Sequence, residues 1–147
     1  MVTLTLPPAG QGDAFAAGAA AESGGVTIEI PAGGSVTVDE LIYEEPDQQV
    51  FRAVLLPAGA NVPAVSPELG LGVVYGTAPL ETVFCPPARV RVPNTLGWAA
   101  GAPVEFLVLG LDIAQHWAPY AGWEMLSDGA VSADGTVDLS IRTTFAY

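Results

Sequence analysis

The chain has 147 residues, of which half are hydrophobic and 14% are charged. This length is typical of one domain, and this composition excludes a disordered chain. Sixteen acidic residues against four arginines and no lysine give a formal net charge of -12. Such a surface disfavours nucleic acid and anionic membranes and permits divalent cations or basic proteins as partners, although it also fits a surface that serves only solubility. Every stretch of about eighteen residues contains charges or turn signals, so we predict no transmembrane helix and no membrane insertion.

The first 23 residues are predicted to hold a short strand and a connection. Residues 3–6 alternate in polarity and stop at Pro7-Pro8, which ends a strand. Residues 13–21 are the best helical candidate, but Gly18 and the pair Gly24-Gly25 cut this stretch short, and a plain connection is the alternative. Because a terminal strand can add to another sheet, the segment 1–23 could also be exchanged with a neighbouring molecule.

The rest of the chain consists of short strand signals separated by Gly, Pro, Asn and Asp. Residues 26–30 place Val and Ile on one face, and residues 88–92 place two valines inward and two arginines outward. Residues 104–109 form a nearly continuous apolar run, which predicts a central strand covered on both faces. Turns are expected at 76–79 and 132–135. The other predicted strands are 35–41, 50–56, 72–75, 82–84, 123–126, 130–131 and 137–141.

These signals predict an all-β fold with little helix. About nine or ten short strands with turn residues between them are typical of a sandwich or barrel, and they leave no room for helical crossovers. The sequence contains neither a Pro/Ser-rich linker nor an internal repeat. We therefore predict a single antiparallel β-sandwich domain over residues 1–147.

Three segments resemble a known family of β-sandwich domains. The first is Gly-Gly-Val-Thr-Ile-Glu-Ile-Pro-Ala-Gly at 24–33. The second joins Gly-Thr-Ala-Pro-Leu-Glu-Thr-Val-Phe at 76–84 to Pro-Ala-Arg-Val-Arg-Val-Pro at 87–93, and the third runs from 94 through Trp123 to Asp-Gly at 134–135. Together they are similar to ZU-type domains of ankyrins, netrin receptors and tight-junction scaffolds, and to looser relatives in bacterial surface proteins.

The resemblance implies a protein-binding or spacer module. Some members of that family cleave themselves where a His precedes a Phe near the end of the fold. Here the corresponding end is Thr-Thr-Phe-Ala at 143–146, and no His stands beside a Phe. The resemblance therefore does not imply self-cleavage for this chain.

Residues for nucleophilic catalysis are sparse. His116 is the only histidine, and no Gly-x-Ser-x-Gly elbow accompanies it, so we predict that the chain is not an enzyme. A small hydrolase that uses paired carboxylates is the enzymatic alternative that stays open. Cys85 is the only cysteine, which excludes an intrachain disulfide, and its Phe and Pro neighbours predict a buried, unreactive thiol.

One histidine and one cysteine are too few to build a metal site on these residue types, and no cofactor is predicted. Calcium is the one metal that the carboxylates permit. Its weak candidates are Asp128 and Asp134, each of which is followed directly by glycine, and Asp138. Their spacing differs from that of an EF-hand loop, and Asp-Gly is common in hairpin turns, which is the alternative interpretation.

An aromatic cluster is the most unusual feature of the sequence. Trp117, Tyr120 and Trp123 fall within seven residues, and Trp98 could join them. These rings could stack on a sugar or anchor a protein interface. The alternative is that they fold over the open end of the sandwich and complete its core.

Two functional classes follow from these features. We expect a non-enzymatic structural or protein-binding β module, a subunit or domain of a filament, surface protein or virion decoration, whose partner is a protein and could be a copy of itself. The alternative is a carbohydrate-binding module that uses Trp117 to Trp123. An extracellular, cell-surface or virion location is favoured. The chain starts without the basic and apolar regions of a secretory signal, so either it works where it is made or a leader lies outside this sequence.

Overall fold

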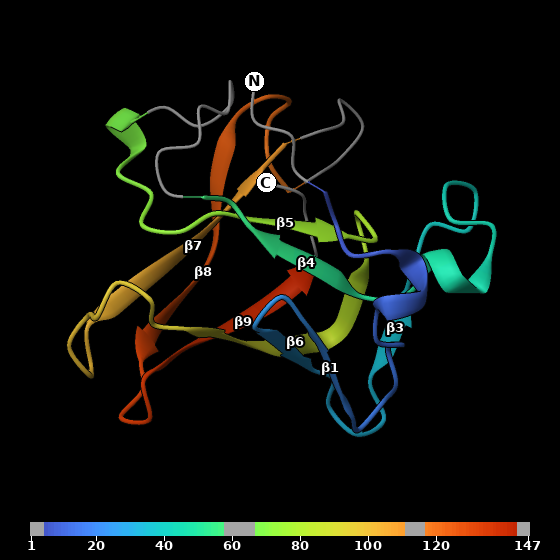
Figure 1. Ribbon diagram of the computed structural model, residues 1–147, viewed down its shortest axis with the longest axis horizontal. Helices are drawn as coiled ribbons and strands as arrows, with labels where there is room; N and C mark the ends of the chain where they lie inside the picture. Colours follow the sequence, from blue (N-terminus) through green and yellow to red (C-terminus); the bar gives the residue numbers. More distant parts are fainter. Residues whose placement is uncertain (1–4, 58–66, 111–116, 144–147) are drawn as a thin grey trace.

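The computed structural model describes residues 5–57, 67–110 and 117–143. In these ranges the chain forms nine strands and three short 3-10 turns, and it contains no α-helix (Figure 1). The strands are β1 (Ala20–Ser23), β2 (Val26–Glu29), β3 (Ser35–Thr37), β4 (Arg52–Leu55), β5 (Tyr75–Ala78), β6 (Val83–Pro93), β7 (Pro103–Leu109), β8 (Trp123–Val131) and β9 (Thr136–Thr143). The 3-10 turns are η1 (Ala9–Gln11), η2 (Pro46–Gln48) and η3 (Pro67–Leu69). The predicted all-β class is confirmed.

The strands form two antiparallel sheets of unequal size. The larger sheet has seven strands in the order β1-β2-β6-β9-β8-β7, and β3 pairs with the first part of β6. The smaller sheet contains only β4 and β5 and lies across the larger one (Figure 1). This arrangement is sandwich-like, but one layer is much narrower than the other.

The core lies between the two sheets. The inward residues of β2, β6 and β9 are buried, as the alternation at 26–30 and 88–92 predicts, and they meet Phe51 and Ala53 at the start of β4. Phe51 has no exposed surface, and the ring of Phe15 packs between it and Phe84 at centroid distances of 5.9 and 5.5 Å. The narrow layer is therefore anchored by aromatic packing.

The opposite face of the large sheet is polar. The guanidinium of Arg89 binds Asp138 at 2.9 Å, and that of Arg91 binds Glu29. These residues sit on neighbouring strands, because β6 pairs with β2 on one side and with β9 on the other. Cys85 lies in the same long strand and is exposed, because Phe84 before it points into the core. The prediction of a buried thiol is therefore wrong.

Several predicted elements differ from the observed ones. The stretch 13–21 is not helical: the backbone of Asp13 pairs with Phe51, and Gly18 has a positive φ of 74°, which breaks a helix. Residues 76–79 are not a turn, since Gly76 to Ala78 continue β5 and pair with β4. The predicted strand at 3–6 lies partly outside the described residues, and Thr5 and Leu6 are not in a strand. Exchange of residues 1–23 stays a prediction, and β1 pairs with β2 of its own chain.

Two pairs of predicted strands are each one continuous strand. β6 begins at Val83 and joins the strands predicted at 82–84 and 88–92, because an irregularity in its pairing with β9 accommodates the prolines 86 and 87. β8 spans 123–126 and 130–131 in the same way, with a register shift in its pairing with β7.

The position of β7 is the most important correction. The apolar run at 104–109 predicts a central strand, yet among the described residues β7 pairs only with β8 and forms the edge of the large sheet. Natural sheets generally protect their edges with charges or prolines, and β7 has one of each, Pro103 at its start and Glu105, but its other five residues are apolar. Its apolar side chains require another explanation, which the neighbouring cavity supplies.

Candidate binding site: an apolar cavity beside an edge strand

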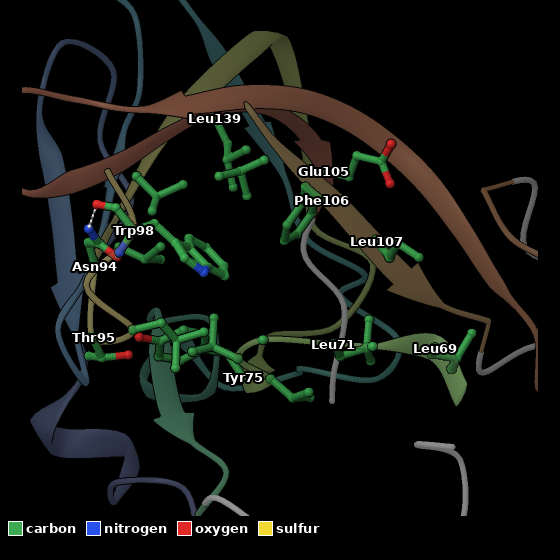
Figure 2. A pocket seen from close by; sticks show the side chains of 18 of the residues that line it. Leu69, Leu71, Tyr75, Asn94, Thr95, Trp98, Glu105, Phe106, Leu107 and Leu139 are labelled. Atoms are coloured by element: carbon green, nitrogen blue, oxygen red, sulfur yellow. Dashed lines mark hydrogen bonds between the residues drawn. The ribbon is translucent and has the colours of Figure 1, made fainter. Parts of the chain in front are cut away.

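A cavity of about 430 Å³ lies between the layers, where the small sheet leaves part of the large sheet uncovered. The segment before β5, the turn after β6 and the whole of β7 surround it, together with residues of β8 and β9. Figure 2 shows Leu139 and Phe106 on the side of the large sheet and Tyr75 and Leu71 opposite them. The cavity exists because two strands are too few to cover seven.

The walls of the cavity are mainly apolar. The segment from η3 to β5 contributes Leu69, Leu71 and two valines, and β7 contributes Val104, Phe106 and Leu107. A pocket of this size with apolar walls is in the range of ligand-binding sites, which are usually a few hundred cubic ångströms. A ligand that fills this cavity would therefore have to present apolar groups.

Trp98 forms one end of the cavity and is held in place by the preceding turn. The amide of Asn94 donates to the Trp98 carbonyl at 2.7 Å, and the Trp98 N–H donates back to the Asn94 side-chain oxygen at 2.9 Å (Figure 2). The indole ring packs against Gly72, where an added Cβ would lie 2.7 Å from the ring. A glycine at position 72 thus allows the segment before β5 to approach the tryptophan closely.

Polar groups around the cavity are few. The phenol of Tyr75 is half-buried, and this burial raises its pKa above the ordinary value, so the phenol is neutral at physiological pH. Glu105 is the only charged side chain among the described lining residues, and it is exposed at the rim. The described lining contains no His, Cys or Ser, and its side-chain hydroxyl groups are those of Tyr75, Thr77 and Thr95.

The edge beside the cavity carries unbalanced negative charge. Glu105 on β7 stands directly opposite Asp128 on β8, and Glu124 is exposed further along β8. Like charges directly opposite each other on a sheet are destabilising, and among the described residues no arginine forms an ion pair with these three. A partner with a basic side chain at this edge would relieve that repulsion.

The four predicted aromatic residues do not form one platform. Trp98 and Trp123 line the cavity. Trp117 instead packs with Val108, Ala118 and Leu126 in a small separate cluster, which agrees with the core-completing interpretation for this one residue. Tyr120 is 65% exposed, and its backbone pairs with Gly110.

The calcium candidates are also dispersed. The carboxylate of Asp138 binds Arg89 and the Ser132 hydroxyl, and that of Asp134 accepts from the Thr136 N–H at 3.0 Å and hydroxyl at 2.7 Å within a hairpin turn. Asp128 is exposed on β8. In the described part of the chain no three His, Cys, Asp or Glu residues gather as metal ligands would. His116 lies outside the described residues.

Most cavity residues were not identified from the sequence. Only Trp98 and Trp123 are among the residues that the sequence singles out, whereas Phe106 and Tyr75 fall in predicted strands and the leucines at 69 and 71 carry no prediction. A usable signal is the stretch Leu-Gly-Leu-Gly-Val-Val-Tyr at 69–75, in which leucines alternate with glycines just before the apolar residues of the short strand predicted at 72–75. Apolar residues in a loop need a surface to cover, and here they cover the cavity.

No helix within residues 5–57, 67–110 and 117–143 is long and apolar enough to span a bilayer. Comparisons with protein families, with curated proteins and with solved structures find no match to this chain. The resemblance to ZU-type domains therefore stays a prediction.

Proposed function

We propose that the chain is a non-enzymatic protein-binding β module that takes an extended apolar segment of another protein into the cavity beside β7. The observation that carries this proposal is the coincidence of an apolar cavity with an apolar edge strand. An added strand would pair its backbone with the edge of β7 that no described strand occupies, and every second side chain would point toward the cavity. Both features would then be covered by one partner.

The chemistry of the cavity favours a peptide over a sugar. A sugar needs a dense set of hydrogen-bonding groups around an exposed aromatic platform, and this cavity has few polar groups. The aromatic residues are also divided between the cavity and the separate cluster of Trp117. The carbohydrate-binding alternative thus has little support from the geometry.

Charge further restricts the partner. The whole chain has a formal net charge of -12, and Glu105, Asp128 and Glu124 lie along the β7–β8 edge. An acidic peptide would be repelled, whereas a segment that alternates apolar residues with Lys, Arg or neutral polar residues would be attracted or tolerated.

Copies of the same chain are among the partners that this proposal allows. Residues 2–6, Val-Thr-Leu-Thr-Leu, alternate apolar and neutral residues and contain no acidic group. The two acidic bodies would repel each other, so such self-association should strengthen as salt screens the charges. Light scattering of the chain with and without residues 1–6, at low and high salt, tests this possibility.

The decisive experiment uses a synthetic peptide that alternates valine with lysine and is long enough to pair with all of β7. We expect it to change the tryptophan fluorescence and to protect the amides of β7 from hydrogen exchange. The matched control is the peptide in which glutamate replaces lysine, which should bind far more weakly. Binding that leaves β7 unprotected, or equal binding of both peptides, would contradict the proposal. Binding of a glycan panel at the cavity would instead support the carbohydrate-binding class.

A further inference from the structure

The loop between β3 and β4 forms a second surface, and its composition differs from that of the cavity. Leu41 is 90% exposed and Ile42 is 61% exposed, and they stand next to each other. Single exposed apolar residues are ordinary, but here two adjacent ones each expose more than half of their surface to water. In Figure 1 this loop extends away from both sheets.

The loop is held in a defined shape by hydrogen bonds. The Asp39 side chain accepts from the Leu41 N–H at 2.9 Å, and the Asp39 carbonyl accepts from the N–H groups of Ile42 and Tyr43 at 3.2 and 2.9 Å. Two contacts of Tyr43 tie the loop down: its hydroxyl accepts from the Leu80 N–H at 2.7 Å, and its carbonyl accepts from the Gln49 amide at 2.8 Å. Leu41 and Ile42 therefore lie in a turn whose conformation is fixed by these hydrogen bonds.

The exposed pair is bordered by negative charge alone. Glu40, Glu44, Glu45 and Asp47 are all exposed, and residues 39–47 contain no basic side chain. None of these residues lines the cavity. The surface thus combines an apolar centre with an acidic border, which defines the chemistry of its complement.

We propose that the loop 39–47 is a docking surface for a partner protein that presents an apolar patch bordered by Lys or Arg. Burial of Leu41 and Ile42 would supply the affinity, and the carboxylates would set orientation and association rate. A second copy of this chain fits this surface poorly, because it has no lysine and only four arginines, of which Arg89 and Arg91 are paired with acidic residues. Two chains that each have a formal net charge of -12 also repel each other. An anionic membrane is excluded by the same repulsion.

The test uses an amphipathic helical peptide of leucine and lysine as the probe, titrated into the full chain labelled with ¹⁵N. We expect the largest chemical-shift changes at the amides of residues 40–45 and a dissociation constant that rises with salt. The double variant Leu41→Ser with Ile42→Ser should bind at least about tenfold more weakly, the loss expected when a leucine-sized contact is removed. The variant Glu40→Gln with Glu44→Gln should also bind more weakly and show a smaller salt dependence.

The matched control is Leu55→Ser with Met125→Ser, which removes two other exposed apolar side chains and should bind the probe like the unaltered chain. Because Leu41 and Ile42 are exposed, the thermal midpoint should be unchanged in the test variant, so weaker binding cannot reflect unfolding. Equal affinity of the serine variant, or equal weakening by the control, would overturn the proposal. If only the Gln variant binds the probe more weakly, the proposal is also overturned, because binding would then reflect unspecific charge attraction alone.

Discussion

A larger side chain at Val104 tests whether the cavity between the layers is an open space. Val104 lies on β7, is half-buried, and lines the cavity. In the variant Val104→Phe, the side chain gains four carbon atoms that would extend into about 430 Å³ of apolar space. If half of the added surface is buried, the free energy of unfolding should rise by about 1 to 2 kcal/mol.

The same substitution in a closed core would have the opposite sign. Extra carbon atoms in a well-packed interior force neighbouring side chains out of their preferred rotamers, and this typically costs about 1 to 3 kcal/mol. Chemical denaturation in urea separates the two outcomes, because the midpoint should shift while the slope stays constant. A lower free energy of unfolding for Val104→Phe would refute the assignment of this region as an open cavity.

Binding gives the second measurement on this variant. A phenyl ring in the cavity should compete with the incoming side chains of the Val/Lys peptide, so affinity should fall while stability rises. The matched control is Val54→Phe, because Val54 is also a half-buried strand valine but does not line the cavity. It should leave peptide binding unchanged. Binding of the Leu/Lys probe to the loop 39–47 should be unchanged in both variants, so failure of one proposal does not imply failure of the other.

Three further substitutions test the fold. Phe51→Ala should lower the free energy of unfolding by about 3 to 5 kcal/mol, because this side chain is fully buried between the sheets; urea denaturation measures it, and a loss below 1 kcal/mol would contradict the packing. Gly24→Ala should cost about 2 to 4 kcal/mol, since Gly24 has a φ of 58° and an added Cβ would overlap the Ala53 carbonyl; a variant as stable as the parent would refute this close approach. Hydrogen bonds from Thr136 lower the pKa of Asp134. The ionised Asp134 carboxylate therefore stabilises the fold at pH values above the ordinary carboxyl pKa of about 4, and this stabilisation is lost as the pH falls from there through the lowered pKa. Asp134→Ala should flatten the thermal midpoint against pH in that acidic window, and an unaltered profile would exclude this role.

The sequence is sufficient to predict the fold class because the evidence for it is local. Alternation at 26–30 and 88–92 places the same residues inward that are buried in the structure, and the turn at 132–135 forms as expected. Whether two neighbouring strand signals join into one continuous strand is not determined by local sequence. Prolines 86 and 87 suggest a break, but the partner strand accommodates them with an irregularity in register. Such compensation depends on a distant segment and is invisible in the strand itself.

The cavity could not be predicted for a related reason. Alternation shows which face of a strand is apolar, but it does not show whether another layer covers that face. Here the covering sheet has only two strands, and nothing in the segments 52–55 and 75–78 indicates that they pair with each other alone. Trp98 and Trp123 were identified as unusual because aromatic residues stand out in a sequence, while Phe106 and Leu71 resembled ordinary core residues.

The location of β7 links the fold to the proposed function. A continuous apolar strand is normally interior, because an exposed one would pair with other chains and aggregate. Among the described residues such a strand lies at the edge, and its protection is Pro103 at its start and the negative charge of Glu105 and of Asp128 opposite it. Negative charge repels acidic chains, including copies of this one at low salt, but it attracts basic segments. Under the proposed function, this charge would disfavour unselective association and leave the edge accessible to one class of partner, and that selectivity would distinguish a binding site from an aggregation site.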